Sequence, residues 1–191
     1  MATIRLGTAS PSTQGSTAAT LSLLSSIAAR AAQQSIDILL LPEAFFGGYP
    51  RGTSFGCVIG ERKESGRDEY ADYFDAAVDL GDIVGEGNAG AGDRWVRREL
   101  PATALESAAS QESSGKTQAK RGDGTREELE RIARETGVFI VTGLIERAGG
   151  SLYCSAVYVC PQQGIIGKRR KVMPVSVFSV SVSVLLHCKL C

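Results

Sequence analysis

The first fifty residues consist of two short apolar segments separated by a helical pattern. Residues 3–10 alternate well enough to form a strand. From residue 16 to about residue 34, Leu, Ile and Ala recur at the spacing of one helix face. Residues 35–41 are a second apolar run of strand length. This order predicts a β-α-β unit with two parallel strands and a covering helix, and therefore an α/β fold.

The later part of the chain predicts one helix followed by a pair of antiparallel strands. Thr125 is a plausible N-cap with Glu128 at the capping-box position, and the helix should end at Gly137. Residues 138–147 then have the pattern of a buried strand. A Gly-rich turn leads into a second strand, residues 151–160, so a β-hairpin is expected here.

The interval between these two parts differs in composition. A helical pattern over residues 66–78 is followed by a stretch, residues 81–124, that is rich first in Gly and then in Ser, Ala, Gln and Lys. A polar stretch of this length inside a domain is typical of a flexible surface insertion. The only tryptophan, Trp95, could anchor a partner, but packing of the insertion back onto the surface is the favoured interpretation.

Composition and charge narrow the class of protein. The chain has 191 residues, 43% hydrophobic and 22% charged, which fits a soluble globular protein of one domain or a little more. The formal net charge of zero gives no electrostatic reason to expect binding to nucleic acid or to an anionic membrane. No apolar run approaches the roughly 20 residues of a membrane-spanning helix, and a secretory signal is missing. We therefore predict a cytoplasmic protein.

The cysteines predict free thiols rather than a disulfide framework, because their number is odd and no export signal precedes them. They are Cys57, Cys154, Cys160, Cys188 and Cys191. The last two have C-x-x-C spacing, but no second pair accompanies them and His187 is the only histidine, so we expect no metal site. Cys154 and Cys160 lie in a predicted strand and should be small, largely buried residues rather than nucleophiles. Nothing near Cys57 would lower its pKa.

A single carboxylate, Glu43, stands where the second apolar run ends. Pro42 precedes it, and Phe45, Phe46 and a Gly-Gly-Tyr-Pro sequence follow. The run has the length of a strand buried on both faces, and open α/β folds bind ligands at such strand ends. Burial among aromatic rings should raise the pKa of Glu43 toward the range of a general base. The alternative is that Glu43 only caps or solvates the strand end.

A basic segment near the end of the chain has two interpretations. Residues 167–174 read Gly-Lys-Arg-Arg-Lys-Val-Met-Pro. They could form a solvated basic turn or a small anion-binding patch. Alternatively, they could form a catalytic motif in which the lysine at position 171 is the functional residue.

Both segments resemble the active-site motifs of the nitrilase family of carbon–nitrogen hydrolases. Residues 37–50 resemble the first motif, a hydrophobic strand followed by P-E, a short apolar spacer and G-Y-P. Residues 167–174 resemble the second, G-K-H-R-K-L-x-P, with Arg169 in place of the usual histidine. The resemblance implies that Glu43 is the general base or proton acceptor and that Lys171 stabilises the charged intermediate. A Glu-Lys-Cys set of this kind needs neither a metal nor an organic cofactor.

The third member of that set is missing from the sequence. The family's nucleophilic cysteine lies farther along in a C-W-E-N sequence, and here no cysteine is followed by Trp-Glu-Asn. Residues 175–191 are instead a low-complexity stretch in which Val and Ser alternate, followed by a few residues of different composition. We therefore predict a partial carbon–nitrogen hydrolase domain over residues 1–174, with the flexible insertion at 81–124, and an aberrant tail over 175–191, as a retained intron or frameshift would produce.

The resemblance implies the N-terminal half of an α-β-β-α sandwich. It also implies hydrolysis of a nitrile to a carboxylic acid and ammonia, with a small nitrile or cyanide as substrate, although the missing cysteine predicts that this chain is inactive. The alternatives are a non-catalytic fragment that associates with full-length homologues or with itself, and an inert mis-spliced product. An incomplete sandwich should expose apolar sheet surface and be marginally stable or prone to aggregate.

Overall fold

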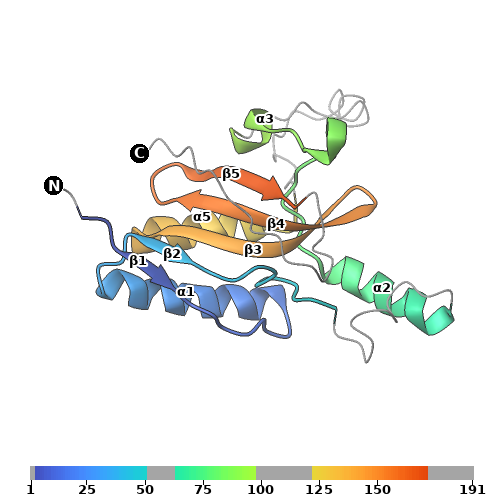
Figure 1. The fold of residues 1–191 in the computed structure, drawn as a ribbon, viewed down its shortest axis with the longest axis horizontal. Helices are drawn as coiled ribbons and strands as arrows, with labels where there is room; N and C mark the ends of the chain where they lie inside the picture. Colours follow the sequence, from blue (N-terminus) through green and yellow to red (C-terminus); the bar gives the residue numbers. More distant parts are fainter. Residues whose placement is uncertain (1–2, 51–62, 98–121, 172–191) are drawn as a thin grey trace, which may run out of the picture.

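Strands and helices of the computed structural model are described for residues 3–50, 63–97 and 122–171. They form one mixed sheet, and the helices of residues 17–33 and 125–136 lie on one of its faces (Figure 1). In chain order the elements are β1 (Leu6–Thr8), α1 (Thr17–Gln33), β2 (Ile38–Leu40), α2 (Glu64–Ala76), the 3₁₀ turn η1 (Glu86–Asn88), α3 (Asp93–Val96), α5 (Thr125–Thr136), β3 (Phe139–Ala148), β4 (Ser151–Cys160) and β5 (Gly164–Arg170). The tail, Cys57, His187, Cys188 and Cys191 lie outside the described residues.

The sheet has the strand order β1-β2-β3-β4-β5, with its first three strands parallel and its last three antiparallel. Leu6 pairs with Ile38, and Ile38 in turn pairs with Phe139. The predicted β-α-β unit and the predicted hairpin are therefore both confirmed. The α/β class is confirmed too, and the described part forms one helix-plus-sheet half of the expected sandwich.

Two helices, α1 and α5, lie against each other on the same face of the sheet (Figure 1). Helix α1 begins at Ser16, whose hydroxyl accepts a hydrogen bond from the backbone N–H of Ala19 and so caps the helix. Its apolar face, which includes Leu24 and Ile27, is buried together with Leu129 of α5 in one hydrophobic core. Within the described residues, none of the helices is long and apolar enough to cross a membrane.

The start of α5 differs from the predicted capping box. The N-cap is Gly124, in the left-handed region at φ 96°, and no side chain caps the helix there. Asp123 accepts a hydrogen bond from the backbone N–H of Thr125 instead. A carboxylate one residue earlier therefore satisfies a donor of the first turn. The end of α5 at Gly137, also left-handed, is as predicted.

The other face of the sheet is open near β1 and β2. Leu39 and Leu41 are buried beneath the helices, whereas Leu40 is 47% exposed and Leu6 is 71% exposed. Side chains of a strand alternate between faces, so the apolar run at residues 38–41 presents its two sides to different surroundings. The prediction of a strand buried on both faces is wrong for the described part of the chain.

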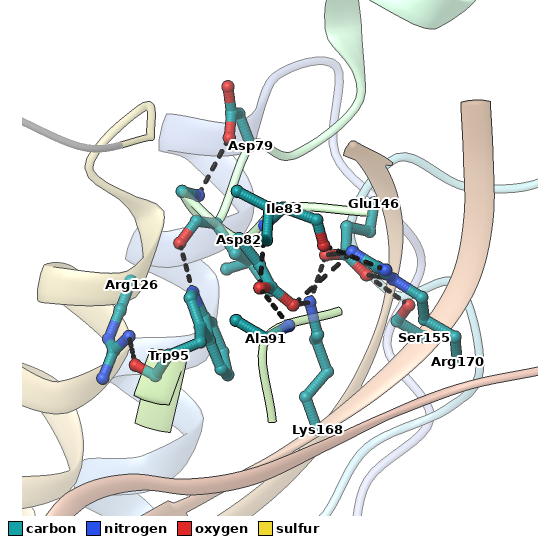
Figure 2. A network of polar contacts seen from close by, with 12 residues as sticks. Asp79, Asp82, Ile83, Ala91, Trp95, Arg126, Glu146, Ser155, Lys168 and Arg170 are labelled. Carbon is teal, nitrogen blue, oxygen red and sulfur yellow. Dashed lines mark hydrogen bonds and ion pairs between the residues drawn. The ribbon is translucent and has the colours of Figure 1, made fainter. Parts of the chain in front are cut away.

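The basic segment forms a strand rather than the loop or turn that the sequence suggested. Strand β5 pairs with β4, and its alternation turns Lys168 and Arg170 toward the helix-covered face. Lys168 contacts Asp82 at 2.5 Å and also Glu146. Arg170 contacts Glu146 through two nitrogens at 2.8 and 2.9 Å, and Ser155 donates to the same carboxylate at 2.7 Å. All four charged side chains are buried and paired (Figure 2).

Trp95 of α3 joins this buried network to α5 (Figure 2). Its indole N–H donates to the carbonyl of Leu80 at 3.1 Å. The cations of Lys168 and Arg126 each lie 4.5 Å from the centre of its ring. Trp95 is buried, so it packs its segment onto the domain as expected. Whether residues 81–124 form a flexible insertion stays a prediction, because residues 98–121 are not described.

The segment after β2 lies directly against β3. The backbone N–H of Phe46 donates to Gly143, and the N–H of Ile145 donates back to Phe46. A Cβ atom at Gly143 would lie 2.6 Å from the Cα of Glu43 and 2.6 Å from the carbonyl oxygen of Pro42. The missing side chain at Gly143 therefore permits the close approach that fixes Glu43 over the sheet.

We expect Glu146→Gln to destabilise the fold by about 3–5 kcal/mol, because it leaves Lys168 and Arg170 buried with one carboxylate between them. Urea unfolding at pH 7, followed by circular dichroism, measures this. Glu128→Gln is the control, because the Glu128 side chain is 45% exposed and solvent screens its pair with Arg131, so its loss should barely move the midpoint. Equal midpoints for the two variants would contradict the importance of the buried network.

We expect Gly143→Ala to cost about 1–3 kcal/mol, since the new methyl group meets backbone atoms that cannot rotate away. Gly150→Ala in the hairpin turn is the matched control, because no atom lies within 4 Å of a Cβ there. The same unfolding measurement applies. A Gly143→Ala protein as stable as the control would show that Glu43 is not held by this contact.

Candidate active site

Glu43 is positioned by a tight turn that follows β2. Ala44 has a positive φ of 53°, which a residue with a side chain adopts only when its surroundings enforce it. The N–H of Gly48 donates to the carbonyl of Ala44 at 3.0 Å and closes the turn. Phe45 and Phe46 are buried in the core, edge to face at 5.1 Å, and anchor the turn from below. The carboxylate is thus held on a rigid support.

Lys171 follows β5 and lies on the face opposite to Arg170. Its backbone N–H donates to the carbonyl of Cys154 at 2.8 Å, which continues the pairing with β4 by one residue. Its Nζ lies 2.6 Å from Oε1 of Glu43. The structure therefore brings together the two predicted site residues, which are 128 positions apart in the sequence.

Cys154 completes a cluster that sequence reasoning did not assemble. It lies on β4 as predicted, but it is half-buried and its thiol donates to Oε1 of Glu43 at 3.0 Å. Cys160, on the same strand, is buried as predicted. The signal that could have found Cys154 is strand alternation: Cys154 pairs with Ile145, and both share the face that carries Lys171.

The protonation states of the cluster follow from these contacts. Burial alone would raise the pKa of Glu43, but hydrogen bonds from Lys171, Cys154 and Tyr49 outweigh it and hold the pKa below its usual value. The predicted rise in this pKa is therefore wrong: the aromatic rings of Phe45 and Phe46 lie in the core, and a cation faces the carboxylate. The hydrogen bond to Glu43 raises the pKa of Lys171. At neutral pH the pair is a carboxylate and an ammonium.

The ion pair between Glu43 and Lys171 makes the stability of the fold decrease at acidic pH. The pKa of Glu43 is lower in the folded chain, so the pair stabilises the fold above the unfolded value of about 4.3, and this stabilisation is lost as the pH falls through the folded pKa. The side chains of Glu43 and Lys171 are 44% and 32% exposed. Solvent therefore screens the pair, and its contribution is at most about 1 kcal/mol.

A groove of about 510 Å³ lies beside Glu43. It is lined by residues 10–13 and by the turn from Pro42 to Tyr49. Its lining combines Ser, Thr and Glu43 with apolar residues, and its volume lies in the range that holds a small molecule. In the part of the chain that the structure describes, no group of three or more His, Cys, Asp or Glu side chains is arranged to bind a metal ion.

Comparison with known proteins agrees with these motifs. The family described as carbon-nitrogen hydrolase matches residues 3–185, which extends past residue 174, where the tail was predicted to begin. The arylacetonitrilase of Trametes versicolor is 37% identical over 138 residues, covering 72% of this chain and 30% of the relative. The aliphatic nitrilase of Sinorhizobium fredii is 34% identical over 155 residues, covering 81% and 35%. The boundary at residue 174 stays a prediction.

Among solved structures, an amidase from Nesterenkonia sp. aligns with 91% of this chain and 44% of its own, at 16% identity and a TM-score of 0.48. Nitrilase 3 of Arabidopsis thaliana is 32% identical over 160 residues, covering 84% of this chain and 34% of the relative. The chain thus spans about a third of the length of the curated relatives that it matches. Both motifs are present, and the family match covers residues 3–185 of the 191 residues in this chain. The chain therefore belongs to the carbon–nitrogen hydrolase family.

Proposed function

We propose that this chain supplies the base and the charge-stabilising lysine for hydrolysis of a nitrile to a carboxylic acid and ammonia. The contact between Glu43 Oε1 and Lys171 Nζ, at 2.6 Å, carries the proposal. It unites the two residues that the family motifs assign to these roles, at the edge of a groove of suitable size. The similarity to an arylacetonitrilase and an aliphatic nitrilase makes nitriles the substrate class of choice.

The chemistry divides between the two side chains. The carboxylate of Glu43 accepts the proton of a thiol nucleophile, and the resulting thiolate attacks the nitrile carbon. Negative charge then builds on the nitrile nitrogen, where the ammonium of Lys171 stabilises it. Water, activated by Glu43, attacks the thioimidate and releases ammonia. A second water hydrolyses the remaining thioester to the acid and restores the thiol.

The nucleophile in this scheme is a cysteine, which the family carries at the start of a Cys-Trp-Glu-Asn sequence. None of the cysteines in the 191-residue sequence begins such a sequence. Cys154 touches the base, but burial and the hydrogen bond to Glu43 raise the pKa of its thiol to about 12. A thiol with this pKa is almost entirely protonated at neutral pH and is a poor nucleophile. We therefore propose that the chain by itself is catalytically silent.

We expect the purified chain to release no ammonia from phenylacetonitrile, an aliphatic nitrile or cyanide, measured in a coupled ammonia assay beside the arylacetonitrilase of Trametes versicolor. A chimera in which residues 3–171 replace the matching part of that relative should release ammonia. In the chimera, Lys171→Met should reduce the rate by about 10²–10³ and Glu43→Gln by about 10²–10⁴.

Glu135→Gln is the control in the same chimera, because Glu135 is an exposed residue of α5 that pairs with Arg131 of the same helix. Its rate should equal that of the parent chimera. A Glu43→Gln chimera that keeps the parent rate would remove Glu43 from the mechanism. Ammonia release by the unmodified chain would show that one of its own cysteines acts as nucleophile.

A second candidate function is association through the open face of the sheet, with a full-length homologue or with a second copy. Leu6 and Leu40 lie on that face and are both largely exposed. Their exposure is what favours this candidate, because two large aliphatic side chains on one sheet surface are more favourable when covered.

We expect the chain to co-elute with a full-length nitrilase, or to self-associate, in size-exclusion chromatography with light scattering. The double variant Leu6→Thr, Leu40→Thr should elute as a monomer, because it makes the open face polar and places β-branched side chains, which suit a strand, at both positions. Ile83→Thr is the matched control, since Ile83 is as exposed as Leu40, at 47%, but lies outside the sheet. A parent chain that elutes as a monomer and does not co-elute with the homologue would rule out this candidate.

A further inference from the structure

Cys154 connects the two members of the candidate site through different parts of the same residue. Its thiol donates to Oε1 of Glu43 at 3.0 Å, and its backbone carbonyl accepts from the N–H of Lys171 at 2.8 Å. Lys171 Nζ reaches the same Oε1 at 2.6 Å. We propose that Cys154 is a positioning residue of the active site, which orients the Glu43 carboxylate through its protonated thiol and sets its distance to Lys171.

The position of Cys154 in the sheet makes this role specific. Cys154 pairs with Ile145 on β3, and the N–H of Ile145 donates to Phe46 in the turn that carries Glu43. A series of neighbouring residues on adjacent strands therefore connects this turn, through Ile145 and Cys154, with Lys171. Of the three side chains that form the cluster, Cys154 lies on the strand between the other two. A shift of β4 would displace both of its partners.

The thiol acts here as a donor and not as an acid. Its pKa is about 12, while hydrogen bonds hold the pKa of Glu43 below the ordinary value of a carboxyl group. Transfer of the thiol proton to the carboxylate is therefore strongly uphill. The proton stays on sulfur, and Oε1 of the carboxylate receives one neutral and one charged donor, in addition to the hydrogen bond that the carboxylate accepts from Tyr49. Two donors on one atom fix the rotation of the carboxylate better than either alone.

The inference rests on the proposed function for the meaning of Glu43 as a base, but its test does not require turnover. The pKa of Glu43 is measured by ¹³C NMR titration of chain labelled at the glutamate carboxyl, with the resonance assigned from Glu43→Gln. Cys154→Val removes the donor and keeps a side chain of similar size that suits a strand. Cys154→Ser keeps a donor. Lys171→Met serves as the positive control for loss of a donor.

We expect Cys154→Val to raise the pKa of Glu43 by about 0.5–1 pH unit, the equivalent of one lost hydrogen bond, whereas Cys154→Ser leaves it within a few tenths. Lys171→Met should raise it as well. Cys160→Ala is the matched control, because Cys160 lies on the same strand and contacts Gln162 rather than Glu43. Its titration should equal that of the parent chain.

Equal shifts in the Val and Ser variants, or no shift in either, would overturn the proposal. Alkylation provides a second test that does not depend on any variant. A protonated Cys154 should react with iodoacetamide at pH 7 more slowly than a cysteine in an unfolded peptide, as followed by peptide mass mapping. Faster reaction would reveal a thiolate and would also overturn it. If the pKa shift appears but the chimera releases no ammonia, the proposed function fails and the positioning contact stands.

Discussion

The alternation of β5 is the constraint on which the rest of this structure depends. Its last residues are all basic, and the two-residue repeat of a strand sends them to opposite faces of the sheet. Lys168 and Arg170 enter the helix-covered face, where Asp82 and Glu146 neutralise them. Lys171 is left to face Glu43 on the open side. A slip of one residue would turn Lys168 and Arg170 out of the helix-covered face and move Lys171 away from Glu43, so the buried network and the site depend on the same register.

The buried network is sensitive to the loss of any partner because its charges are removed from water. A charge removed from water is tolerated only when partners replace its hydration, and breaking such a pair costs several kcal/mol. The pair on the open face is weaker, because solvent screens Glu43 and Lys171. Loss of one partner is therefore costly in the buried network, whereas the exposed pair holds the two side chains that we propose to react. Trp95, against which both Lys168 and Arg126 stack, extends this support to α5.

What the sequence could predict was mostly local. Periodicity and turn residues were enough for the β-α-β unit, the hairpin and the end of α5 at Gly137, because each depends on neighbouring residues. The family motifs named Glu43 and Lys171, and the structure places them in contact. The partners of the basic strand could not be found in this way, since Asp82 lies 86 residues from Lys168. The place of Cys154 was missed for the same reason, because its contact with Glu43 spans 111 residues.

The wrong prediction about the pKa of Glu43 shows how the open face affects the chemistry. Burial raises that pKa and three hydrogen-bond donors lower it, and at the present exposure the donors prevail. A layer that covers the open face would remove water from both Glu43 and Lys171. Desolvation would then count more heavily against the carboxylate, whereas its contact with Lys171 would be less screened. The pKa of Glu43 would therefore respond to a layer packed above it as well as to its neighbours in the sheet.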